Sequence, residues 1–331
     1  MIARRSVVLA LGAGAVAAPF APFAQQPPAK VWRLGYLGPG AAASASSSAN
    51  SVEALRAGLR GHGYIEGKTL VIEYRWAEGK ADRLPDLAAE LVRLNVDLIV
   101  TNGGAGAIAA SRATRTIPIV VAASGDLVAL GLAASLARPG CNLTGQILFA
   151  EALSAKGLEL LKEAMPGLTR AAVLGPPADP TTQLGLDTIA ATAKHLKVEV
   201  PFFTVQGVTD YESAFAAMVK QRVGAVLVSD NALLGFTVKT SADFALRHRL
   251  PSSGILIFAE AGGMLGYGVN LLDMFRRAAV LVDRIFKGAR PGDIPIEQAA
   301  RFELVVNMKT AKAIGVKIPQ SILLRATKVI E

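Results

Sequence analysis

The sequence predicts an α/β protein of two doubly wound parallel-sheet lobes joined by a hinge. At 331 residues the chain is long enough for two domains that each bury a core. Short apolar runs that end at Gly, Pro, Ser, Asp or Asn alternate with helical stripes, which is typical of parallel sheets covered by helices. Three such runs in the first half have counterparts in the second: 32–40 with 170–179, 97–104 with 224–231, and 116–126 with 249–263.

The first residues predict a secretory signal peptide over residues 1–24. Arg4 and Arg5 precede an apolar stretch at 7–18, which small residues and prolines follow. This stretch is shorter than the ~20 residues of a membrane-spanning helix, which favours export over an anchor. Ala18 and Ala24 are both candidate last residues of the signal, and the Sec and twin-arginine routes both stay open. We therefore expect the mature protein in the periplasm.

The elements of the first half follow from hydrophobic periodicity. We expect strands at 31–37, 70–74, 97–101 and 117–122, a loop of small residues at 38–50, a helix from Ser51 to Gly61, a helix marked by Leu84, Leu87 and Leu91 with Asp82 as its cap, and a helix at 105–114.

The second half repeats this order and adds a carboxyl-terminal extension. We expect helices around 158–165, 186–196, 211–218 (capped by Asp210) and 275–286, strands at 171–174, 198–204, 225–229 and 302–307, and a short last helix. All of these apolar stripes are expected to be core.

The segment 135–145 separates the two halves and predicts a hinge. Pro139 and Gly140 end the preceding helix, and an extended crossing between the lobes is expected after them. An ordinary surface loop is the alternative. The predicted first lobe comprises 31–144 with about 264–291, and the second comprises 145–263 with about 292–331.

Composition and motifs exclude several function classes. With 52% hydrophobic and 18% charged residues the chain is not disordered, and Cys141 as the single cysteine leaves no internal disulfide. His62, His195 and His248 are far apart in sequence, so no metal site is predicted. The net charge of +9 is scattered, which argues against nucleic acid binding while allowing a bias toward anionic solutes. No P-loop, GxSxG or dinucleotide motif is complete, so we expect no cofactor and no enzyme activity.

Several strings carry a resemblance to a known family: 116–126, 135–145, 261–268, 273–298 and 302–319. The chain resembles the solute-binding proteins of ABC importers, in the family that includes tryptophan- and tyrosine-type binding proteins with the type I periplasmic binding protein fold. The resemblance implies a monomer whose lobes close by hinge bending on a small organic solute, which it delivers to an ABC permease in the inner membrane. A ligand-sensing subunit for a membrane receptor is the alternative, and a periplasmic enzyme is a more remote one.

Two departures from the family pattern concern the solute. The loop at 41–50 consists of small residues where aromatic amino-acid binders carry larger polar side chains, and Asp126-Leu127 replaces the usual Asp-Pro. The resemblance therefore does not identify tryptophan or tyrosine as the ligand of this chain. Another organic acid, amide or amino-acid-like compound is equally compatible with the sequence.

Ligands of open α/β sheets bind at the carboxyl ends of the strands, which gives the candidate residues of the first lobe. The backbone amides that open the helix after Asn102 suit a carboxylate, although the glycines there are also explained by a tight turn. The first-lobe candidates are Ser46, Ser47, Asn102, Gly103, Ser124 and Asp126.

The second lobe offers carboxylates and aromatic rings. Asp230 and Glu260 suit the ammonium of a solute, and each is also a candidate helix cap. Phe258 and Tyr267 suit an aromatic or apolar group, or else fill core. The second-lobe candidates are Asp230, Asn231, Phe258, Glu260 and Tyr267. This asymmetry predicts that the first lobe holds an acid group and the second an amine.

Overall fold

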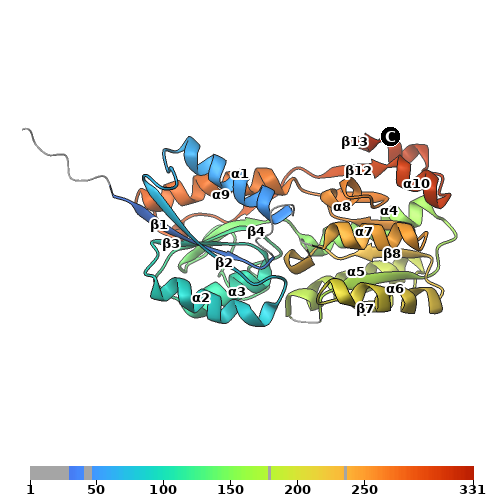
Figure 1. Cartoon of the computed structure of the whole chain (residues 1–331), viewed down its shortest axis with the longest axis horizontal. Coiled ribbons are helices and arrows are strands. Elements are labelled where there is room, and N and C mark those ends of the chain that lie inside the picture. The colour runs from blue at the N-terminus through green and yellow to red at the C-terminus, as the bar shows by residue number, and fades with distance from the viewer. Residues whose placement is uncertain (1–29, 41–46, 178–179, 235–236) are drawn as a thin grey trace, which may run out of the picture. The chain divides into compact units, whose positions relative to one another are not determined.

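The computed structural model describes residues 30–40, 47–177, 180–234 and 237–331 (Figure 1). The predicted signal peptide and Ser46 lie outside these residues. Within the described ranges no helix is both long enough and apolar enough to cross a membrane.

The first lobe is a parallel sheet of six strands in the order β11-β5-β4-β3-β1-β2. Helices α1 and α9 cover one face and α2 and α3 the other (Figure 1). The elements are β1 (Trp32–Gly38), α1 (Ser47–Gly61), β2 (Leu70–Trp76), η1 (Ala81–Arg83), α2 (Leu84–Arg93), β3 (Leu98–Thr101), α3 (Gly103–Ala113), β4 (Ile119–Ser124), β5 (Leu143–Ile147), α9 (Leu271–Phe286), η4 (Pro291–Asp293) and β11 (Glu297–Gln298).

The second lobe is a sheet of seven strands in the order β13-β12-β10-β9-β8-β6-β7, with an antiparallel pairing between β10 and β12. Helices α4, α5, α10 and α11 share one core, and α6, α7 and α8 share the other. The elements are α4 (Ala150–Ala164), β6 (Ala171–Gly175), α5 (Pro180–Leu196), β7 (Phe202–Thr204), η2 (Val208–Asp210), α6 (Tyr211–Lys220), β8 (Ala225–Val228), η3 (Ala232–Leu234), α7 (Val238–Arg247), β9 (Ser252–Gly254), α8 (Leu256–Glu260), β10 (Leu265–Gly268), β12 (Glu303–Asn307), α10 (Met308–Ile314), α11 (Gln320–Leu323) and β13 (Lys328–Ile330).

Helices α1 and α9 pack closely against each other. A Cβ built on Gly58 would lie 2.7 Å from the Cβ of Ala279, so only glycine permits this approach. Just after α1 ends, Tyr64 donates a hydrogen bond to Oδ1 of Asp283 in α9 at 3.0 Å. This packing brings the first turns of α1 beside the start of α9.

The chain crosses between the lobes at other places than we predicted. Strand β5 pairs with β4 in the first sheet, and β10 pairs with β9 and β12 in the second. Segment 135–145 is therefore part of the first lobe, where the Asn142 amide donates to the carbonyls of Thr114 and Ile117 at 3.3 and 2.7 Å. The observed crossings follow β5, β10 and β11, so residues 145–147 and 292–298 join the first lobe and 264–268 the second.

A small apolar cluster joins the three crossings. Its buried members come from the end of β4, from α4 and α9, and from the residues that follow β5 and β10: Ala123, Leu148, Leu153, Val269 and Met274. Because residues of both lobes share this cluster, it defines the hinge region of the described chain.

Phe149 directly follows Leu148 of this cluster and has an unusual backbone conformation. Its φ of 54° and ψ of 49° are left-handed, which costs a residue with a side chain about 1–2 kcal/mol. We predict that Phe149→Gly is about 1 kcal/mol more stable than Phe149→Ala, since both variants lose the ring and only glycine avoids the strain. Urea unfolding followed by circular dichroism measures the difference. A more stable alanine variant, as found at ordinary positions, would contradict the strain.

Candidate functional site

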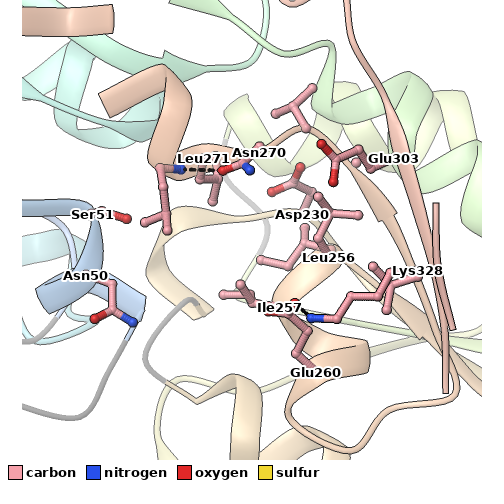
Figure 2. A pocket seen from close by; sticks show the side chains of 15 residues that line it. Asn50, Ser51, Asp230, Leu256, Ile257, Glu260, Asn270, Leu271, Glu303 and Lys328 are labelled. Carbon is pink, nitrogen blue, oxygen red and sulfur yellow. Dashed lines mark hydrogen bonds and ion pairs between the residues drawn. The ribbon is translucent and has the colours of Figure 1, made fainter. Parts of the chain in front are cut away.

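A cavity of about 210 Å³ lies where α1 of the first lobe faces the second lobe (Figure 2). Its wall combines aliphatic side chains with three carboxylates and one ammonium group. The lining residues are Asn50, Ser51, Asp230, Ile255, Leu256, Ile257, Glu260, Gly268, Val269, Asn270, Leu271, Leu272, Glu303, Val305 and Lys328.

The first lobe contributes neutral polar groups to this cavity. Asn50 and Ser51 lie in the first turns of α1, which packs on α9, and both line the cavity on the side of the first lobe (Figure 2). Asn270 caps α9, because its Oδ1 accepts hydrogen bonds from the amides of Leu272 and Asp273. Hydroxyl and amide groups of this kind can orient a solute without adding charge.

Two acidic residues of the second lobe lie on the side of the cavity near Asn270 (Figure 2). Asp230 follows β8, and its backbone amide donates to Oγ of Ser154 at 3.3 Å. Glu303 opens β12 and lies 3.8 Å from the guanidinium of Arg301. Carboxylates at these positions can accept charge-assisted hydrogen bonds from a cationic group.

An ion pair forms another part of the wall. Nζ of Lys328, in β13, lies 2.6 Å from Oε1 of Glu260, the last residue of α8 (Figure 2). Glu260 is not at a strand end as predicted, because β9 stops at Gly254 and the apolar residues after it form α8. A short apolar run of this length is compatible with a strand or a helix, and here it is helical.

The structure brings some of the predicted site residues together. Asp230 and Glu260 both line the cavity, and Asn231 follows Asp230 directly. Tyr267 shares a small recess with Asp230 beside the cavity and stacks on Phe302, with ring centroids 6.3 Å apart. Asp230 therefore shares the cavity wall with Glu260 and the adjoining recess with Tyr267.

Other predicted residues have structural partners instead. Phe258 is completely buried in the core of the second lobe and does not line the cavity, so filling core, the alternative left open for it, is what the structure shows. Asp126 accepts hydrogen bonds from the amides of Val128 and Ala129 at 2.8 and 3.0 Å, and thereby holds its own turn. Ser47 is the first residue of α1.

The remaining first-lobe candidates lie at strand ends outside this cavity. Asn102 precedes α3, and its Oδ1 accepts a hydrogen bond from the hydroxyl of Tyr36 at 3.4 Å. Burial raises the pKa of Tyr36, and the charge of Tyr74 adds a smaller effect in the same direction. The Tyr36 hydroxyl therefore stays protonated and can donate the hydrogen bond to Asn102. Ser124 is buried at the end of β4, and its Oγ has no hydrogen-bond partner among the residues that the structure describes.

Gly103 marks a contact between the two lobes. Its φ is 74°, and a Cβ built on it would lie 2.7 Å from the Cβ of Ala232 in η3. The start of α3 therefore lies directly against the second lobe, with no room for a side chain at position 103.

Sequence reasoning missed five polar residues of the cavity: Asn50, Ser51, Asn270, Glu303 and Lys328. Asn270 had a usable signal, since an asparagine directly before a long amphipathic helix is a typical cap. Glu303 and Lys328 had none, because they come from strands whose position depends on the antiparallel pairing of β12 with β10.

The arrangement suits the binding of a solute with charged and apolar parts. The aliphatic residues can exclude water from an apolar group while the charged residues fix its polar end. In the part of the chain that the structure describes, no group of His, Cys, Asp and Glu could hold a metal ion.

Comparison with known proteins identifies the family. The sequence profile of the ABC transporter substrate binding proteins matches residues 42–330. A tyrosine-binding protein of Clostridioides difficile (strain R20291) is 25% identical over 265 residues, which are 78% of this chain and 74% of that protein.

Solved structures share the fold. An ABC domain from Streptococcus pneumonia in complex with L-Trp superposes with a TM-score of 0.80 at 22% identity, covering 90% of this chain and 99% of that one. A conserved domain protein from Vibrio cholerae O1 biovar El Tor gives 0.81 at 24% identity, covering 91% and 100%. These matches confirm the predicted fold, with two parallel-sheet lobes as in type I periplasmic binding proteins. The chain belongs to the ABC transporter substrate-binding proteins, a family that binds solutes and does not convert them.

Proposed function

We propose that this protein captures a small amino-acid-like solute in the cavity beside α1 and delivers it to an ABC permease in the inner membrane. The observation that carries the proposal is the composition of the cavity wall, in which Asp230, Glu303 and the Lys328–Glu260 pair surround aliphatic side chains. The predicted signal peptide supports a periplasmic location for this capture.

The volume of the cavity supports a small solute. At about 210 Å³ it is below the roughly 300–1,000 Å³ of pockets that hold drug-sized ligands. The names of the relatives add that a tyrosine-binding protein and an L-Trp complex are similar to this chain. A zwitterionic solute with an apolar or aromatic part fits both the wall and these relatives.

The hinge cluster and the contact between Gly103 and Ala232 support capture by closure. Val269 belongs to the hinge cluster and also lines the cavity, and Leu271 packs against that cluster from the cavity wall. A solute that fills the cavity therefore contacts residues on which the relative position of the lobes depends. Closure of this kind needs backbone changes at only a few residues.

Thermal unfolding of the mature protein against a panel of amino acids and aromatic acids tests the proposal. A solute at 100 times its dissociation constant adds roughly 2.7 kcal/mol to the free energy of unfolding, so we expect a raised melting temperature with zwitterionic members of the panel. Leu256→Trp, which fills the cavity, should abolish the shift. Leu246→Trp, at a leucine that is 37% exposed on α7, should keep it. A panel without any shift, or an equal shift in both variants, would contradict the proposed site.

A further inference from the structure

We propose that Lys328 binds the carboxylate of the solute, and that Glu260 occupies Lys328 until the solute replaces it. This assignment rests on the proposed function and names the polar group that the cavity recognises. Strand β13 would then help to select solutes that carry a carboxylate. The positions of polar residues at predicted strand ends do not indicate this role.

The fold holds Lys328 firmly at the cavity. In the parallel pairing of β12 and β13 the partner of Lys328 is Val305, which also lines the cavity. The residue before it, Thr327, donates through Oγ1 to the carbonyl of Leu304 at 3.0 Å and accepts from the Leu304 amide at 3.1 Å. These bonds fix the strand, so only the flexible side chain of Lys328 has to move for a solute to enter.

The ion pair between Lys328 and Glu260 is suited to exchange. The two side chains are 55% and 44% exposed, and ion pairs exposed to this degree contribute little to the stability of a protein. Replacing the carboxylate of Glu260 with that of a solute therefore costs little. The apolar part of the solute would contact Leu256 and Ile257, and these contacts add to its binding free energy.

This assignment differs from the prediction that the first lobe holds the acid group. The start of α3, which was expected to bind a carboxylate, lies against Ala232 through Gly103. Among the described residues that line the cavity, those of the first lobe carry no charge, whereas the second lobe supplies both signs. Lys328 would therefore hold the acid end of the solute from the second lobe.

Titration calorimetry with two acids and their amides tests the assignment: L-tyrosine with L-tyrosinamide, and L-tryptophan with L-tryptophanamide. We expect Lys328→Met to weaken binding of the acid that wild type binds by about 10-fold, as expected for loss of a charged hydrogen bond, while the affinity for its amide stays within about twofold. Lys317→Met removes an exposed lysine that does not line the cavity and should leave both affinities unchanged.

The variant Glu260→Gln and the double variant Glu260→Gln/Lys328→Met separate direct contact from a general charge effect. Glu260→Gln should keep the preference for the acid, because Lys328 is then free to bind it. The double variant restores the net charge of wild type, yet it should still lack the preference. Recovery of the preference in the double variant, or an unchanged ratio of acid to amide affinity in Lys328→Met, would overturn the assignment.

The outcomes also separate this inference from the proposed function. If wild type binds none of these four probes, the proposed solute class is wrong and the assignment falls with it. If wild type binds an acid and Lys328→Met keeps the wild-type ratio, only the role of Lys328 is wrong.

Discussion

Replacing Asp230 with asparagine is expected to weaken solute binding by about 10- to 100-fold, because a hydrogen bond to a charged group contributes about 1.5–3 kcal/mol. Asp230 lines the cavity two residues after the end of β8, on the side where Asn270 and Glu303 also lie. Asparagine has nearly the same shape and removes only the charge. The loss should therefore affect solutes that carry an ammonium group and spare analogues that lack it. Titration calorimetry with L-tyrosine or L-tryptophan and with the corresponding desamino acids measures the difference.

Asp126→Asn is the matched control for this substitution. Asp126 also follows a strand, but its carboxylate accepts from two backbone amides of its own turn and does not line the cavity. An asparagine oxygen can accept the same bonds, so the solute affinity should stay within about twofold of wild type. Equal losses in the two variants, or an Asp230→Asn variant with wild-type affinity, would exclude Asp230 as the partner of the ammonium group.

Truncation of Phe258 to alanine is expected to lower the free energy of unfolding by about 3–5 kcal/mol. The ring is completely buried and fits against two glycines, since a Cβ on Gly263 or Gly254 would lie 2.1 or 2.8 Å from its carbon atoms. Alanine at 258 therefore leaves a cavity that this part of the core cannot refill easily. Urea unfolding should show the loss, while the solute affinity of the folded fraction should remain that of wild type.

Two further variants make the result for Phe258 interpretable. Phe302→Ala removes a ring of the same size that is 38% exposed, so its cost should be much smaller. Phe258→Leu keeps most of the volume and provides a folded protein in which affinity can be measured if the alanine variant does not fold. A selective loss of affinity in Phe258→Leu without a loss of stability would restore Phe258 as a ligand contact.

Much of the fold is predictable because its elements are encoded locally. The stripe of Phe275, Ala279, Val282 and Phe286 predicts α9, and these residues are buried on its inner face as expected. The lobe boundaries are less accessible to sequence reasoning. Pro139 and Gly140 suggest a crossing, yet β5 returns to the first sheet after them, and strand pairing between distant segments decides this.

The candidate site is predictable only where it follows strand ends. Asp230 comes two residues after the end of a short buried strand, close to the carboxyl end where ligands of a parallel sheet are expected. Lys328 and Glu303 depend on the antiparallel pairing of β12 with β10, which no local pattern reveals. Asp126 and Phe258 have the residue types of a binding site. However, Asp126 accepts a hydrogen bond within its own turn, and Phe258 is buried in the core. Residue type and position along a strand do not distinguish these cases.

A crystal structure of the mature protein with the solute that gives the largest thermal shift shows where the solute binds and which side chains hold its polar groups. We expect electron density for the solute in the cavity beside α1, with its carboxylate at Lys328 in place of Glu260. Density for the solute at another place, with the Lys328–Glu260 pair intact and the cavity free of solute, would contradict it.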